Sequence, residues 1–196
     1  MADWTLPTAW AALKREWMLY HLGDQRFRFM WDTPPKNEWV ALDCETTGLN
    51  VRTDEIIAIG AVRIEGSRIL TSQRLELLVR PQGRVSADSV RVHRLRAQDV
   101  AQGLSADEAV MQLMHFIGSR PLVGYYLEFD LAMINRVLFP MLGMGLPQQR
   151  VEVLDGRGLA RTGVADHSDH APARNIQRNV VDGADHLFRR RALQQV

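Results

Sequence analysis

The sequence has one cysteine, little net charge and no long hydrophobic run. The single Cys44 excludes an internal disulfide framework and fits a reducing compartment. Because the formal net charge is only +1, a polyanionic partner would have to be held by local clusters of basic residues. No apolar run approaches the roughly 20 residues of a membrane-spanning helix, and the first residues show no signal peptide. We therefore expect a cytoplasmic protein with no membrane partner.

The length and composition suit one folded domain with an appended N-terminal arm. The chain has 196 residues, of which 46% are hydrophobic. Trp10, Leu13 and Trp17 recur at helical spacing within residues 8–20, which predicts an amphipathic helix. All five tryptophans lie at or before the first predicted strand, and a proline pair closes this Trp-rich arm, residues 1–37. The arm either packs on the domain or docks a polymerase or another partner protein.

Residues 38–155 carry the pattern of an α/β domain. Short apolar and β-branched runs predict strands over residues 39–44, 55–65, 68–80, 121–126 and 151–155. Helical periodicity predicts helices over residues 87–95, 105–117 and 127–139. Short connections between the first three strands indicate an antiparallel meander, which parallel strands extend into a mixed sheet flanked by helices. No sustained period follows, so residues 156–196 are treated as a divergent C-terminal segment without predicted order.

Two acidic residues end the first strand in the stretch "WVALDCETTGLN". Because side chains alternate along a strand, Asp43 and Glu45 share one face while Cys44 points to the other. Two neighbouring carboxylates raise each other's pKa unless a cation lies between them, and oxygen ligands suit Mg²⁺ or Mn²⁺. The Thr46–Gly48 turn then offers hydroxyl and backbone N–H groups where a phosphate would lie beside the metal.

A third acid follows the fourth predicted strand in "PLVGYYLEFDLAMINR". Asp130 lies in the first turn of the predicted helix. A single acidic residue at that place needs no further explanation than its favourable interaction with the helix dipole. If that strand lies beside the first one, however, Asp130 reaches the same end of the sheet as Asp43 and Glu45. Three acids gathered there would form a two-metal site for phosphoryl transfer, with the ions roughly 3.5–4 Å apart.

These two stretches resemble the first two motifs of the DEDD 3′–5′ exonucleases, the family of the DNA polymerase III epsilon proofreading subunit and ribonuclease T. The segment "RVHRLRAQDV" also resembles that family's segment between the meander and the long helix. The resemblance implies a ribonuclease H-like fold, with Asp43, Glu45 and Asp130 as ligands of two divalent cations. It also implies that Thr46 and Leu49 lie near the terminal nucleotide. A single-stranded or frayed 3′ end, of DNA in preference to RNA, is the expected substrate.

The sequence departs from this family at two places. Tyr125 and Tyr126 replace the usual His-Asn pair before Phe129, and these aromatic residues either stack on a nucleotide base or belong to the core. The third motif, His-x4-Asp or Tyr-x3-Asp, does not occur after Asp130. His186 is a candidate general base, but Arg191 stands where its partner acid would be. A divergent terminus or an altered reading frame after the last strand would account for this loss.

The basic residues form two clusters, Arg91 with Arg94 and Arg96, and Arg189–Arg191. Each cluster is either a phosphate contact or an ordinary solvated face. We therefore expect a metal-dependent 3′–5′ exonuclease of the proofreading or repair type. The alternative is a catalytically impaired nucleic-acid-binding or polymerase-associated module that kept the fold.

Overall fold

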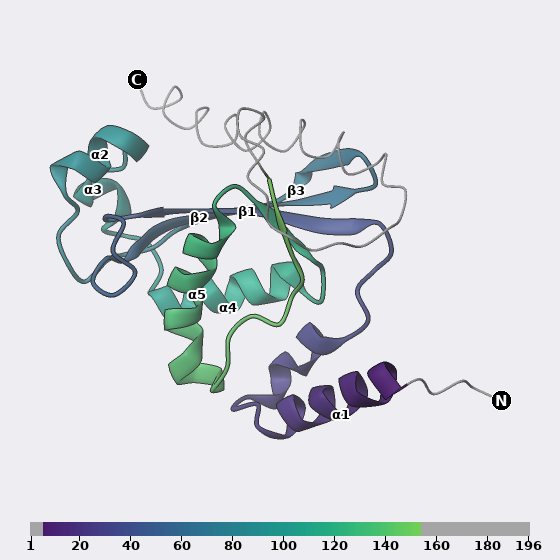
Figure 1. Cartoon of the computed structure of the whole chain (residues 1–196). Coiled ribbons are helices and arrows are strands. Elements are labelled where there is room, and N and C mark those ends of the chain that lie inside the picture. Colours follow the sequence, from purple (N-terminus) through teal and green to yellow (C-terminus); the bar gives the residue numbers. More distant parts are fainter. Residues whose placement is uncertain (1–5, 154–196) are drawn as a thin grey trace.

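The computed structural model describes residues 6–153, which form a mixed sheet with helices α4 and α5 against one face (Figure 1). In chain order the elements are α1 (Leu6–Tyr20), the 3₁₀ helix η1 (Gln25–Trp31), β1 (Glu38–Thr46), β2 (Ile56–Glu65), β3 (Arg68–Leu78), α2 (Ala87–His93), α3 (Ala97–Val100), α4 (Ala106–Ile117), β4 (Leu122–Gly124), α5 (Leu127–Leu142) and β5 (Arg150–Glu152). No helix in this range is long and apolar enough to cross a membrane.

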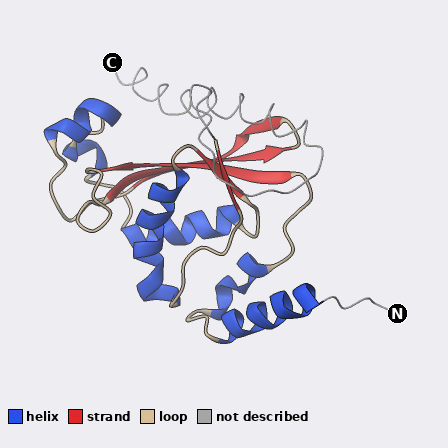
Figure 2. Ribbon diagram, viewed as in Figure 1, coloured by secondary structure: helices blue, strands red, loops and turns tan. Residues whose placement is uncertain are grey.

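The five strands form one sheet (Figure 2), in the order β3-β2-β1-β4-β5. The pairs β1–β2 and β2–β3 are antiparallel, whereas β1–β4 and β4–β5 are parallel. The prediction of a meander extended by parallel strands is therefore confirmed. The short β4 pairs with β1 through Val40 and Leu122 and through Ala41 and Val123. This register brings the carboxyl ends of β1 and β4 to the same edge of the sheet.

Helix α4 follows the sequence prediction closely. Ser105 is its N-cap and accepts a hydrogen bond from the Glu108 N–H at 3.3 Å, while the Glu108 carboxylate accepts one from the Ser105 N–H at 3.0 Å. This capping box satisfies two amides that the first helical turn leaves without partners. The apolar face of α4, including the fully buried Leu113, packs in the main core with α5 and the sheet.

Helix α5 is longer than predicted. We expected it to end before Pro140, but it continues to Leu142. Pro140 lacks a backbone N–H and its ring crowds the preceding turn, which costs conformational free energy. Burial of Leu142 in the core favours the additional helical residues and offsets this cost. The helix ends at Gly143, which has φ +73° and donates its N–H to the Phe139 carbonyl at 2.9 Å.

The N-terminal arm contacts the domain through a different face from the one that the sequence suggested. The residues of α1 that share the predicted stripe are exposed, with Trp10 at 70%, Leu13 at 63% and Trp17 at 62%. Leu19 is buried in the main core, and just beyond α1 the Gly23 N–H donates to the Leu142 carbonyl at 2.9 Å. The arm therefore packs on the domain, as one of the two interpretations predicted, but through Leu19 and η1, whereas the predicted stripe of α1 stays exposed.

Candidate active site

The acidic pair of β1 projects from the sheet face opposite to α4 and α5. Cys44 lies in the core cluster formed with these helices, so Asp43 and Glu45, its neighbours along the strand, face the other way. Their partners across the β1–β2 ladder are Gly60 and Ala58 respectively. Because these residues have little or no side chain, they leave space beside the carboxylates.

Asp130 joins this pair from another part of the chain. It lies in the first turn of α5, immediately after β4, and is only 4% exposed. Its carboxylate accepts a hydrogen bond from the backbone N–H of Cys44, between the two acids of β1. The parallel pairing of β4 with β1 is what brings the start of α5 to this point. The fold therefore brings three acidic residues, from two separate stretches of the chain, to one edge of the sheet.

The electrostatic environment of these acids favours protonation when no cation is present. Burial raises the pKa of Glu45 to about 7, and the negative charge of Asp43 adds to the effect. The pKa of Asp130 is raised to about 8, first by burial and then by Asp43 and Glu45, against the lowering effect of the Cys44 N–H. A divalent cation would relieve the same repulsion that these protons relieve.

The donor atoms at this edge suit a hard divalent cation. Carboxylate oxygens are the preferred ligands of Mg²⁺ and Mn²⁺. Burial raises the pKa of the Cys44 thiol well above its usual value, so it stays neutral and is a poor ligand. Among residues 6–153, no three His, Cys, Asp or Glu side chains stand close enough together to hold an ion. Asp43, Glu45 and Asp130 would thus have to turn toward one another to bind it.

The turn after β1 is held by internal hydrogen bonds and exposes Leu49 to solvent. Thr46 and Thr47 are buried, and their hydroxyls bond within the loop, to the Gly48 carbonyl at 2.7 Å and to the Asp54 carboxylate at 3.3 Å. Both hydroxyls therefore donate within the turn, and a contact between this turn and a phosphate stays a prediction. Leu49 is 84% exposed at the tip of this turn. Its contact with a terminal nucleotide remains a prediction, as does that of Thr46.

The two tyrosines lie outside the core. Strand β4 ends at Gly124, so Tyr125 and Tyr126 occupy the turn into α5, where they are 62% and 68% exposed. The interpretation of these residues as core is therefore wrong. The Tyr126 ring stacks on Phe129, with centroids 6.3 Å apart and planes inclined by 18°.

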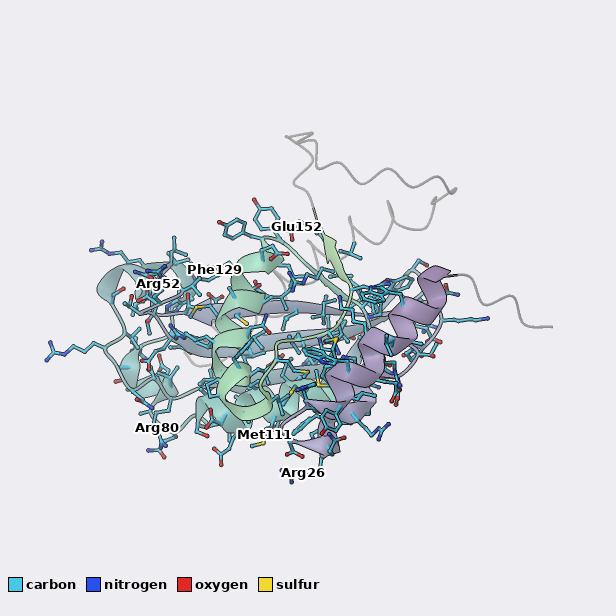
Figure 3. The ribbon with its side chains drawn as sticks, turned by 60° about the horizontal axis from the view of Figure 1, so that its bottom comes forward. Arg26, Arg52, Arg80, Met111, Phe129 and Glu152 are labelled. Carbon is cyan, nitrogen blue, oxygen red and sulfur yellow. The ribbon has the colours of Figure 1, made fainter. Side chains whose placement is uncertain are left out.

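Glu152 is a fourth acid at this edge, and sequence reasoning missed it. It lies at the end of β5, paired in register with Gly124. Both of its carboxylate oxygens are 3.2 Å from the Leu127 N–H, and its charge contributes to the raised pKa of Asp130. In Figure 3, Glu152 and Phe129 are seen toward the same end of α5. The only sequence signal for Glu152 was its position in the last predicted strand. The spacing of residues along the chain does not show that this strand lies beside β4.

The remaining candidates divide between the described residues and those outside them. His93 accepts a hydrogen bond from the Leu95 N–H at 3.0 Å, and burial lowers its pKa. Arg96 is exposed and paired with Asp99 at 3.1 Å, which fits a solvated face. His186 and the second arginine cluster lie outside the described residues.

Comparison with known proteins identifies the family. A family profile described as Exonuclease, of the RNase_T type, matches residues 40–181. A DNA polymerase III of the PolC type from Thermotoga maritima is 27% identical over 116 residues, which are 59% of this chain and 8% of that protein. The DNA polymerase III subunit epsilon of Aquifex aeolicus is 26% identical over 98 residues, 50% of this chain and 48% of that one.

A solved structure shares the fold. The metal-free complex of E. coli exonuclease I with single-stranded DNA superimposes with a TM-score of 0.53 over 60% of this chain and 28% of that chain, at 11% identity. That identity supports similarity of fold alone. The family profile spans most of the chain, including β1 and α5, the elements that carry the three acids. By this match the chain belongs to the exonuclease family.

Proposed function

We propose that the chain is a metal-dependent 3′–5′ exonuclease domain that removes nucleotides from a single-stranded or frayed 3′ end of DNA. The observation that supports this proposal is the hydrogen bond from the Cys44 N–H to Asp130, because Cys44 stands between Asp43 and Glu45 in β1. The family match supports nuclease chemistry, and the relatives are DNA polymerase III proteins.

The three acids would hold two divalent cations, Mg²⁺ or Mn²⁺. When bound, such ions supply an activated water and countercharge for the leaving oxygen. Asp43 and Glu45 would fix the position of the ions from the open face of β1, and Asp130 would do so from the edge. Because Asp130 is buried, bulk water would compete little with a metal ion for its oxygens. The exposed Leu49 would contact the terminal nucleotide.

Release of nucleotides from labelled DNA tests the nuclease directly. A single-stranded oligonucleotide labelled at its 5′ end is incubated with Mn²⁺ and should shorten stepwise from the 3′ end. Asp43→Asn should slow this by about a hundredfold or more, the scale on which a positioned catalytic group acts. Glu65→Gln is a matched control, because Glu65 is exposed and pairs with the opposite end of β1. Equal rates for wild type and Asp43→Asn would refute the proposed site.

The absence of a recognisable third motif supports a second candidate, a nucleic-acid-binding module with little catalysis. The same assay separates the two, because this module would bind the oligonucleotide with no stepwise shortening. Shortening that depends on Asp43 would exclude it. Binding is measured in parallel by fluorescence anisotropy.

We also propose that α1 docks a polymerase or another regulatory protein. The supporting observation is the exposed stripe of Trp10, Leu13 and Trp17, which continues to Tyr20 at 84% exposure. The relatives include a segment within a PolC-type polymerase. The double variant Trp10→Ser, Trp17→Ser should abolish co-elution with the replicative polymerase from the same genome without lowering nuclease activity. Unchanged co-elution would refute the docking role.

A further inference from the structure

We infer that Tyr126, supported by Phe129, is a stacking platform for an unpaired base near the 3′ end of a single strand. The inference rests on the proposed function and names the part of the substrate that this edge of the sheet would hold. Tyr126 is 68% exposed, although its ring already covers one aromatic neighbour. Exposed, rigid aromatic rings are the means by which proteins hold unpaired bases without reading their sequence.

The backbone at Tyr126 is unfavourable for a tyrosine. Its φ is +53°, in the left-handed region that a bulky residue rarely adopts. Tyr126 is also the N-cap residue of α5 but has no side-chain capping bond. A residue chosen for stability here would be Asn, which tolerates this conformation and caps helices well. Tyrosine therefore serves neither the turn nor the helix.

Glu152 supplies the hydrogen-bond acceptor that the Tyr126 side chain does not provide at the start of α5. Its carboxylate, on the neighbouring strand β5, accepts from the Leu127 N–H at 3.2 Å. An amide at the start of α5 is thus satisfied from outside the helix. This leaves the side chain at position 126 free to lie over Phe129, the residue directly before Asp130.

The platform lies beside the acids. The β1–β4 register pairs Ala41 with Val123, and β4 ends one residue later at Gly124, so Tyr125 follows at the same edge of the sheet toward which β1 continues to Asp43. Tyr126 follows at the start of α5, in the same first turn as Asp130. A strand whose terminal phosphate reached the acids would bring one of its last bases to this ring. A paired base is already stacked in its duplex, so the platform favours single-stranded or frayed ends.

The test uses the full chain and an oligodeoxythymidylate carrying one 2-aminopurine at the first, second or third position from the 3′ end. Ca²⁺ replaces Mn²⁺ so that binding is measured without cleavage. Stacking on Tyr126 should quench the 2-aminopurine fluorescence at one of these positions. Tyr126→Asn should remove the quenching and raise Kd about 5- to 100-fold, whereas Tyr126→Phe should keep both.

Two controls separate stacking from a structural role. Tyr126→Asn should leave the midpoint of thermal unfolding unchanged or higher, because Asn suits the left-handed conformation. Phe139→Asn, which removes an aromatic ring of similar exposure (61%) toward the other end of α5, should change neither Kd nor quenching. If the wild type shortens DNA but no position is quenched, or Tyr126→Asn binds as tightly as wild type, the platform is refuted while the nuclease stands. Quenching without cleavage refutes the nuclease and supports the platform.

Discussion

Replacing Asp130 by Asn should make the metal-free protein more stable at alkaline pH, although it removes a residue of the proposed site. Asn keeps an oxygen that can accept the Cys44 N–H, so the geometry of the first turn of α5 is retained. What changes is the charge. In wild type, raising the pH above about 8 forces a negative charge into a buried site beside Asp43 and Glu45.

The sign and size follow from linkage between protonation and folding. The folded-state pKa of Asp130 is raised from 3.8 to about 8, so between these values the folded chain keeps a proton that the unfolded chain releases. Stability from this group is fully present below pH 3.8 and is lost as the pH rises through about 8. The slope is about −1.4 kcal/mol per pH unit, so between pH 5.5 and 7.5 wild type should lose roughly 2–3 kcal/mol more than Asp130→Asn.

Urea unfolding in EDTA at several pH values measures this difference. The free energy of unfolding should fall more steeply with pH for wild type than for Asp130→Asn, and this difference in slope should disappear below about pH 4, where Asp130 is protonated in both the folded and the unfolded chain. Asp107→Asn, which changes an exposed acid on α4, should follow wild type throughout. Parallel curves for wild type and Asp130→Asn would show that Asp130 is not held at a raised pKa. Adding Mn²⁺ at pH 8 should stabilise wild type but not Asp130→Asn, because only binding to the folded state raises stability.

Three further substitutions test the turn after β1, the start of α5 and the core beneath the sheet. Gly48→Ala should destabilise the chain by about 1–2 kcal/mol in urea unfolding, because a Cβ there would lie 2.6 Å from the Asp54 carboxylate that bonds the turn. Glu152→Ala should cost about 1–3 kcal/mol by leaving the Leu127 N–H unsatisfied, whereas Glu152→Gln should cost much less; equal losses would show that the acceptor oxygen is unimportant. Leu113→Ala should cost about 2–5 kcal/mol by opening a cavity under the sheet, and a loss below 1 kcal/mol would contradict its complete burial.

The sequence alone determined the features that depend on short-range periodicity. Alternation along β1 put Asp43 and Glu45 on one face, and the spacing of Ser105 and Glu108 fixed the start of α4. The order of elements was also sufficient for the mixed sheet, because short connections favour antiparallel neighbours and helical crossovers favour parallel ones. These inferences need only residues that are close together in the chain.

Contacts between distant segments were decided only by the tertiary structure. The pairing of β4 with β1 brought Asp130 to the Cys44 N–H. From the sequence, this position of Asp130 followed only if the fourth strand lay beside the first. Glu152 entered the site because β5 pairs with β4, and no local pattern distinguishes it from other surface acids. The stripe on α1 reads as a core face, yet Trp10 is exposed. Periodicity identifies an apolar face, but its burial depends on whether another surface packs against it, and that is a property of the folded chain.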